Sequence, residues 1–280
     1  MNRKMKSLSS IGATLLLCCA SASGSEADDP HLPLWEVGVA GAGTSTPAYP
    51  ASDQRSERAL ALPFLIYRGE VLRADQSGIG ARLLHTDAIE FDVGFALSLP
   101  ARSDDVPARS GMPDLGPLVE FGPRVKVTLA RPAPGSFVRL EVPLRAVFEA
   151  NGGLRREGWA FEPKLVYETG DALGRWNLNA NLGVVLADAK FSNYFYEIKQ
   201  PFATIDRPSY RAKSGLMSTR AGVSGWHKLG PDWRLFGFIR YDNYAGSANR
   251  ASPLFEQNSG VSIGIGFAWT LYRSKASARK

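Results

Sequence analysis

Residues 89–99, IEFDVGFALSL, alternate between apolar and polar or small side chains without a break. The odd positions from Ile89 to Leu99 are all apolar, whereas the even positions are Glu90, Asp92, Gly94, Ala96 and Ser98. Successive side chains of a β-strand point to opposite faces, so this pattern predicts a strand with one apolar face. Its length is typical of a membrane-spanning strand, which needs about 9–11 residues, rather than of a soluble strand of about 5–6.

The same alternation recurs along the whole chain, and turn-forming clusters such as Pro132-Ala-Pro-Gly135 and Asn151-Gly-Gly153 separate the alternating segments. The pattern predicts twelve strands, an even number, at residues 34–43, 58–67, 70–74, 78–84, 88–99, 117–130, 136–149, 158–169, 174–187, 214–226, 233–244 and 260–272. Two architectures produce such strands, a soluble sandwich and an antiparallel transmembrane β-barrel. The length of the strands favours the barrel.

The connections between these strands differ in length on the two sides of the expected barrel. One side carries the longer ones, at residues 44–57, 75–77, 100–116, 150–157, 188–213 and 245–259, and the other side only short turns. Long outer loops opposite short periplasmic turns are typical of outer-membrane barrels. If residues 70–84 instead form a single bulged strand, the barrel closes with ten strands.

Aromatic residues near the strand ends also favour a barrel, since interfacial girdles of Trp and Tyr flank its apolar band. The candidates are Trp35, Trp159, Tyr167, Trp176, Trp226, Trp233, Tyr241, Trp269 and Tyr272.

The first 22 residues have the pattern of a cleaved secretory signal peptide. A cationic start with Arg3, Lys4 and Lys6 precedes an apolar stretch and a small-residue cleavage site. Its removal takes away both cysteines and lowers the formal net charge from +6 to +3. We therefore expect a signal peptide at residues 1–22, a periplasmic N-terminal segment at 23–33, the barrel at 34–272 and a periplasmic C-terminal tail at 273–280.

Several motifs of the chain resemble those of the MipA/OmpV family of outer-membrane proteins, the MltA-interacting protein family. They are Pro47-Ala-Tyr-Pro-Ala-Ser-Asp53 with Arg58 and Leu62-Pro-Phe-Leu-Ile-Tyr67, Met112-Pro-Asp-Leu115 with Glu120-Phe-Gly122, Tyr194-Phe-Tyr196 with Ser214-Gly-Leu216, Leu229-Gly-Pro-Asp-Trp233, Tyr241-Asp-Asn-Tyr-Ala-Gly246, Ala251-Ser-Pro-Leu254, and the final strand from Ser262 to Leu271. The resemblance implies an outer-membrane barrel. For the family's namesake it implies a scaffold that joins a murein lytic transglycosylase to a murein synthase.

Catalysis, cofactors and metals find no support in the residue pattern. The three histidines are scattered, none lies in a nucleophile motif, and the expected mature chain has no thiolate. Interspersed charges of both signs in a secreted chain give no reason to expect nucleic-acid binding. The expected partners are outer-membrane lipid, lipopolysaccharide and the barrel-assembly machinery, with the two murein enzymes added by the resemblance.

The parity of the strands points one set of charged side chains into the lumen, where they are expected to pair across strands. This set comprises Glu90, Asp92, Glu120, Arg124, Lys126, Arg139, Glu141, Arg145, Glu162, Lys164, Glu168, Arg220, Arg234 and Arg240. A second set lies in the longest loop and forms either a constriction, a partner site or a simple cap: Tyr194, Phe195, Tyr196, Arg207, Tyr210 and Arg211. Scaffolding, passage of small solutes and surface interaction or adhesion all remain open at this level.

Overall fold

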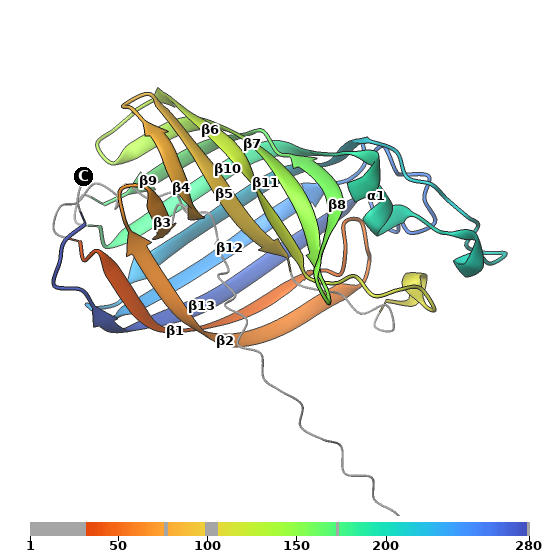
Figure 1. The fold of residues 1–280 in the computed structure, drawn as a ribbon, viewed down its shortest axis with the longest axis horizontal. Helices are drawn as coiled ribbons and strands as arrows, with labels where there is room; N and C mark the ends of the chain where they lie inside the picture. The colour runs from red at the N-terminus through yellow and green to blue at the C-terminus, as the bar shows by residue number, and fades with distance from the viewer. Residues whose placement is uncertain (1–31, 76–77, 99–105, 172–173, 279–280) are drawn as a thin grey trace, which may run out of the picture.

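The computed structural model describes residues 32–75, 78–98, 106–171 and 174–278, which form one antiparallel sheet closed on itself (Figure 1). The strands are β1 (Trp35–Pro47), β2 (Arg55–Arg68), β3 (Leu72–Asp75), β4 (Gly78–His85), β5 (Ile89–Ser98), β6 (Leu118–Ala130), β7 (Ser136–Ala150), β8 (Leu154–Phe161), β9 (Lys164–Gly170), β10 (Trp176–Ala187), β11 (Gly215–Lys228), β12 (Trp233–Asn243) and β13 (Ser259–Arg273). Sequential strands pair, and β13 pairs with β1 to close the barrel.

The barrel wall has twelve strands, because β8 and β9 are two parts of one strand. The break falls at Glu162 and Pro163, where the proline has no N–H to give to a ladder hydrogen bond. Both parts pair with β7 and with β10. The expectation of twelve strands is confirmed, and the ten-strand alternative is wrong because β3 and β4 form a hairpin of their own.

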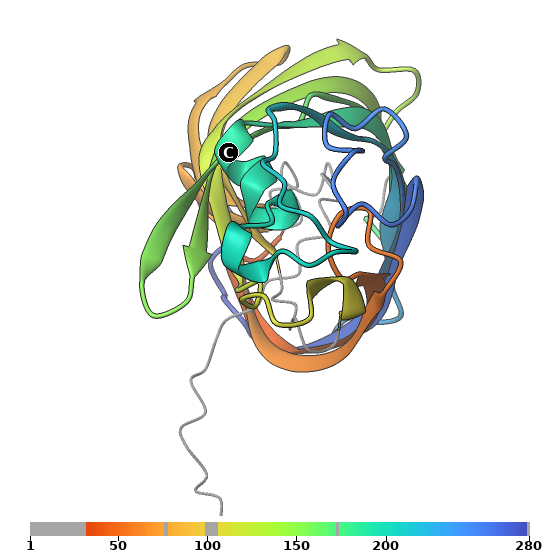
Figure 2. The ribbon, with the colours of Figure 1, turned by 90° about the vertical axis from the view of Figure 1, so that its right-hand side faces the viewer.

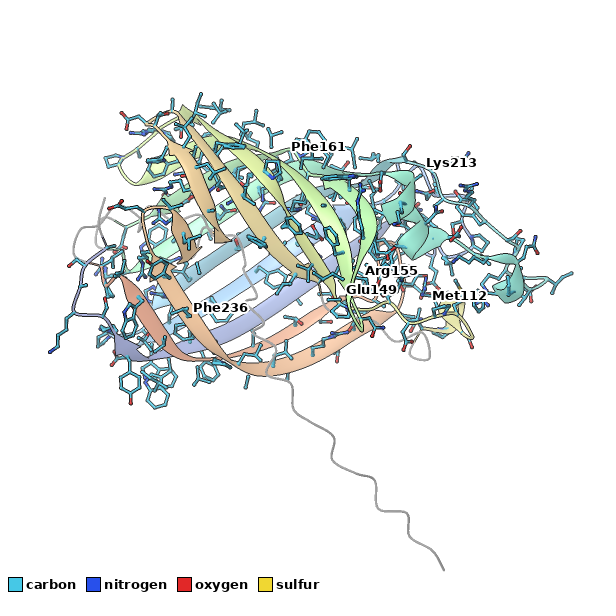
Figure 3. All side chains as sticks on the ribbon, in the orientation of Figure 1. Met112, Glu149, Arg155, Phe161, Lys213 and Phe236 are labelled. Carbon is cyan, nitrogen blue, oxygen red and sulfur yellow. The ribbon has the colours of Figure 1, made fainter. Side chains whose placement is uncertain are left out.

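The outer face of the wall is apolar, as the alternation predicts. The side chains of Leu182, Ile239 and Ile265 are at least half exposed, and many other large apolar side chains on the outer face are also exposed (Figure 3). Such a continuous apolar surface is stable only against lipid. Trp226 is a correction to the expected girdle: it is only 7% exposed and lies inside the lumen beside Arg234 and Lys228.

The two ends of the barrel differ. One end, the loop end, carries the long connections at residues 48–54, 106–117, 188–214 and 244–258, while the opposite turn end carries short ones. The two ends of the described chain lie at the turn end, where Leu34 N–H donates to Ala276 O and Ala278 N–H donates to Leu32 O. The expected signal peptide at residues 1–22 falls outside the described residues. No helix in the described part of the chain has the length and apolar character to span a membrane.

Candidate functional site: the lumen and its cap

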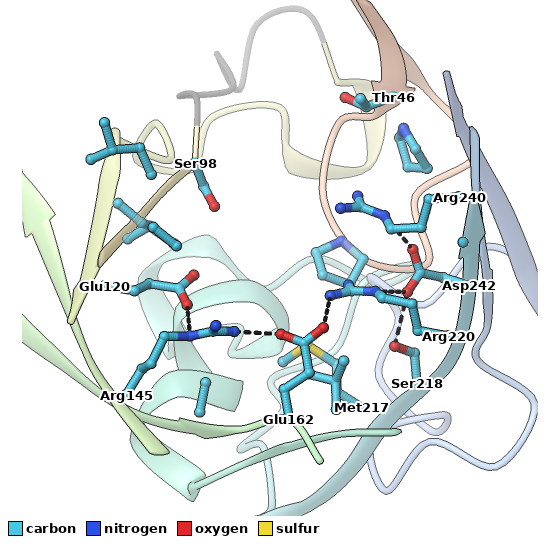
Figure 4. A pocket seen from close by; sticks show the side chains of 18 of the residues that line it. Thr46, Ser98, Glu120, Arg145, Glu162, Met217, Ser218, Arg220, Arg240 and Asp242 are labelled. Carbon is cyan, nitrogen blue, oxygen red and sulfur yellow. Dashed lines mark hydrogen bonds and ion pairs between the residues drawn. The ribbon is translucent and has the colours of Figure 1, made fainter. Parts of the chain in front are cut away.

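A chain of ion pairs crosses the inner wall from β6 to β12 (Figure 4). Arg145 pairs with Glu120 at 2.9 Å and also with Glu162. Arg220 then bridges Glu162 and Asp242, at 2.7 Å to each. Asp242 completes the chain by pairing with Arg240 at 3.0 Å and accepting a hydrogen bond from Ser218 Oγ. Each internal carboxylate is thus shared by two guanidinium groups.

A second group of ion pairs lies on β4 to β9, nearer the turn end. The strand register places Asp92 opposite Arg124 and Glu90 opposite Lys126, and both pairs form, with closest contacts of 2.7 and 2.8 Å. Lys164 pairs with Glu141 at 3.4 Å, and Arg139 pairs with Glu168 at 3.3 Å. Opposite charges at neighbouring register positions satisfy each other where few waters reach them.

The structure places the charged set expected from strand parity on the inner wall, with Arg234 against the ring of Trp226. The sequence reasoning missed Asp242, Arg82 and Arg58. Asp242 has the same parity as Arg240 on β12, so this signal was available. Arg82 was hidden by a bulge between positions 82 and 84 of β4, which shifts the parity. The sequence reasoning also missed Glu36 and Arg68, which form an ion pair at 2.7 Å where β1 meets β2.

The inner face of β12, β13, β1 and β2 also carries apolar and small side chains beside its charged ones. Phe236 and Phe238 lie against Gly266 and Gly264 of the neighbouring strand, and a Cβ at either glycine would come within about 2.5 Å of the ring. Glycine at these two positions lets each phenyl ring lie close to the wall, and a larger residue would force the ring to shift. The inner wall therefore carries charged side chains on both sides, with apolar and small side chains between them on β12, β13, β1 and β2.

The loops at the loop end fold together over the opening (Figure 2). Residues 48–54, 106–117, 188–214 and 244–258 are called the cap below. Its centre is the helix α1 (Ala189–Tyr196), which begins at Asp188, whose carboxylate accepts the N–H of Phe191. Phe191, Phe195 and Tyr196 are buried against Tyr49, Leu115 and Leu254, residues brought from the other cap loops.

Hydrogen bonds join the cap loops to one another. Tyr49 Oη donates to Leu254 O at 2.8 Å and Tyr196 Oη donates to Pro50 O at 3.1 Å. Arg109 donates to Phe195 O at 3.1 Å, and Arg207 donates to Ala108 O at 2.7 Å. The cap is therefore a packed unit with its own small core.

All members of the second predicted set lie in this cap, and each of them other than Arg211 packs in its core or hydrogen-bonds to another of its loops. Tyr194 donates to Gly116 O and to Glu149, and Tyr210 donates to Asn249 Oδ1 at 3.2 Å. Arg211 is exposed and lies apart from the buried core.

Burial sets the ionisation of the cap residues. Desolvation and the nearby Glu256 carboxylate raise the pKa of the Tyr49 hydroxyl well above its ordinary value. Burial also raises the pKa of Tyr244 to about 12 and lowers the pKa of Arg109. The tyrosines therefore stay protonated at neutral pH, and their hydroxyls remain available as hydrogen-bond donors to the carbonyls that join the loops.

The substitution Tyr49→Phe is expected to loosen the cap. It removes a hydroxyl that bonds to Leu254 O and to Glu256 Oε2 at 3.0 Å, which leaves the buried carbonyl of Leu254 without this donor. The expected cost is about 1–2 kcal/mol. Limited proteolysis in detergent will show it as faster cleavage within residues 188–214. The matched control is Tyr210→Phe, whose hydroxyl has a longer bond nearer the surface; equal cleavage rates for the two variants would contradict the prediction.

A cavity of about 500 Å³ lies inside the barrel between the cap and the ion-pair chain. Its roof is formed by cap residues such as Leu115, Phe191 and Phe195, and its wall includes Arg145, Arg220 and other members of the ion-pair chain (Figure 4). Within the described residues no group of three or more potential ligand side chains is placed to hold a metal ion. This cavity offers room for a small molecule within the lumen.

Comparison with solved structures finds outer-membrane barrels of low sequence identity. An outer-membrane channel of Pseudomonas putida F1 is 10% identical with a TM-score of 0.39, covering 88% of this chain and 98% of that one. The translocator domain of the autotransporter NalP from Neisseria meningitidis is 12% identical with a TM-score of 0.39, covering 85% and 89%. The toluene transporter TodX of Pseudomonas putida is 11% identical with a TM-score of 0.36, covering 89% and 92%. No curated protein matches the chain.

The family model described as "MltA-interacting protein MipA" matches residues 38–271. This span takes in nearly the whole barrel and all of the cap, and it agrees with the resemblance carried by the motifs. The apolar outer belt and the match to this family place the protein in the outer membrane. The chain thus belongs to the MipA family of outer-membrane β-barrel proteins.

Proposed function

We propose that this protein is a non-enzymatic channel for small solutes, closed at its outer end by the cap. The observation that carries the proposal is the cavity of about 500 Å³ beneath the cap, whose lining includes polar and charged side chains beside apolar ones. Twelve strands enclose more space than the side chains of an eight-stranded barrel fill. Passage requires the cap to move, because its buried core lies across the opening.

The arrangement of charges in the lumen supports a channel over a lumen that is filled by ion pairs and serves only to stabilise the barrel. The ion pairs share the inner wall with apolar groups such as Phe238, and the cavity beneath the cap is lined by both. A small polar solute can exchange its hydration for contacts with such a wall.

Planar-bilayer recording of the intact protein tests the channel. Brief, discrete openings are expected, separated by long closed periods in which the cap covers the lumen. An eight-stranded barrel purified in the same detergent serves as the control, since its lumen is filled by side chains. A flat current, equal to that of the control barrel at all voltages, would remove the proposal.

A second candidate function is that of a scaffold that binds a murein lytic transglycosylase and links it to a murein synthase. The description of the matching family favours this role. Such a partner must bind at the turn end, where the described surface consists of short turns and of residues 274–278 paired with residues 32–35. We therefore assign the contact to the chain ends, including the expected periplasmic segment at 23–33.

Co-purification from detergent extracts tests this second role. The intact chain is expected to recover the transglycosylase, whereas a variant that lacks residues 274–280 is expected to recover much less. An unrelated outer-membrane barrel, expressed at the same level, measures the background. Equal recovery by all three proteins would argue against the scaffold.

A further inference from the structure

We infer that the barrel wall has a lateral opening between β2 and β5, through which an acyl chain of a membrane lipid enters the lumen and lies on an apolar strip of the inner wall. The inference goes beyond the proposed channel, because it concerns exchange between the lumen and the bilayer and needs no movement of the cap. It depends on how β2 pairs, on which side chains β2 directs inward, and on where the cavity beneath the cap meets the edge of β2.

The pairing of β2 is incomplete on one side. β2 pairs with β1 along nearly its whole length, whereas β3 pairs with it only at Tyr67 and Arg68. Within the described part of the chain, residues 55–66 therefore have no partner strand on the second side. The facing strand, β5, pairs with β4 as far as Phe95, which leaves residues 96–98 without a described partner there. In Figure 1, β12 and β13 of the far wall are seen between β2 and β5.

The backbone groups at this edge of β2 need water. An unpaired sheet edge is not stable against hydrocarbon alone, because its N–H and C=O groups find no partner there, but it is tolerated where it lines a water-filled space. The cavity beneath the cap is such a space, since Ser56 and Arg58 of β2 line it and so do residues 94–98 of β5. The cavity thus reaches both sides of the lateral opening, and the lumen and the bilayer meet there.

The strand β2 also directs apolar side chains into the lumen. Arg68 of β2 and Glu36 of β1 form a buried ion pair on the inner wall, and alternation along β2 then directs Leu60, Leu62 and Phe64 inward as well. Residues 59–66 are all apolar, so this part of β2 is apolar on both faces. Such a strand is typical of a position with apolar surroundings on both sides.

The inward side chains of β2 continue into a strip that crosses the wall to β12. Four residues form one row of this strip, in the order of the strands β2, β1, β13 and β12: Leu60, Ala42, Gly266 and Phe236. The ring of Phe236 lies against Gly266, so two large apolar side chains flank a floor of small ones. Their strands are three spacings apart, about 14 Å, which admits an extended alkyl chain. This row, with Leu62 and Phe64, is called the apolar strip below.

An acyl chain suits the apolar strip better than water does. Leu60, Phe64 and Phe236 are half-buried, so part of each side chain faces the lumen. Covering that surface with an alkyl chain removes it from water and requires no hydrogen bond. The bilayer around the apolar outer belt presents acyl chains at the lateral opening itself. The strip is therefore continuous with the surface that already contacts lipid.

Photo-crosslinking in lipid vesicles tests the inference. The full mature chain with Phe236→p-benzoylphenylalanine is reconstituted in dioleoylphosphatidylcholine vesicles and illuminated. Because β12 is paired on both sides, lipid reaches this inward position only through the lateral opening. Mass spectrometry is expected to show an adduct with the mass of the chain plus one phospholipid.

Two further positions of the same residue type calibrate the adduct. Phe267, which is about half exposed on the outer face of β13, faces the bilayer and is expected to give the same product. Phe137 lies on the inner wall of β7, opposite the buried Glu168 and against Arg139, and is expected to give no lipid adduct. No lipid adduct at Phe236 with a normal yield at Phe267 overturns the inference. Equal yields at Phe236 and Phe137, or an adduct with a second protein in place of lipid, also overturn it.

The substitution Leu60→Gln tests the apolar strip. Combined with the crosslinker at Phe236, it is expected to lower the yield of the lipid adduct by about fivefold or more, because an amide replaces apolar surface beside the acyl chain. Leu65→Gln changes the same residue type on the outer face of the same strand, and it is expected to leave the yield unchanged. Heat-dependent mobility on gel electrophoresis verifies that each variant is folded. Equal yields in the two variants contradict the placement of the chain on the apolar strip.

Discussion

Replacing residues 189–212 with a short Gly-Ser linker is expected to convert brief openings into a persistent current with a several-fold larger conductance. The deleted segment contains α1 and supplies Phe191, Phe195 and Tyr196 to the core of the cap. Without them the remaining cap loops lose their main apolar contacts, and Leu115 and Leu254 become exposed to water. The cavity of about 500 Å³ then opens directly to the outer solution.

The control for this deletion uses the β7–β8 hairpin, whose tip, residues 151–153, projects beside the opening and not across it (Figure 2). Inserting the same linker at Asn151 changes a loop at the same end of the barrel but leaves the cap intact. Its conductance is expected to equal that of the unaltered protein. A folded deletion variant that conducts no more than this control would show that the lumen is closed below the cap.

Glu162→Gln is expected to lower the free energy of unfolding by about 2–3 kcal/mol. This is at or just below the roughly 3–5 kcal/mol usual when one partner of a buried ion pair is removed. The carboxylate of Glu162 pairs with Arg145 and, at 2.7 Å, with Arg220, and it is only 11% exposed. The glutamine keeps the shape but leaves two guanidinium groups with one carboxylate fewer. Arg145 retains Glu120 and Arg220 retains Asp242, which limits the loss.

Urea unfolding in lipid vesicles, followed by tryptophan fluorescence, measures this change. The matched control is Asp232→Asn at the turn end, whose ion pair with Arg273 is nearly half exposed. Exposed pairs contribute at most about 1 kcal/mol, so this variant is expected to unfold close to the unaltered protein. A loss for Glu162→Gln no greater than that for Asp232→Asn would mean that the ion-pair chain does not stabilise the barrel.

The sequence predicts the wall well because strand alternation is a local property. Residues 89–99 show the period directly, and β5 occupies residues 89–98. The direction of a side chain is predicted less well near irregularities. The bulge at Arg82 changes parity, the break at Pro163 divides a strand, and Trp226 lies inside although its position at a strand end suggested an interfacial girdle.

The cap was not predictable in the same way, because its contacts join residues far apart in the chain. Tyr49 meets Leu254, and Arg109 meets Phe195, and no periodic pattern relates them. One signal was present: the motifs around Tyr49, Leu115, Tyr194 and Leu254 are among those that carry the family resemblance. Several such motifs in separate loops indicate that the loops fold into one structure more strongly than a motif in one loop does.

The closure of the barrel has a consequence for how the chain folds. The pairing of β1 with β13, and of residues 32–35 with residues 274–278, joins the two ends of the sequence, so it is the contact with the largest loop to close. Contacts of such high sequence separation form slowly, and until they form both edge strands remain unpaired. A chain truncated before Ser259 lacks the last strand entirely. We therefore expect pairing of the final strand with β1, and not the formation of any earlier hairpin, to set the moment at which an aggregation-prone open sheet becomes a closed barrel.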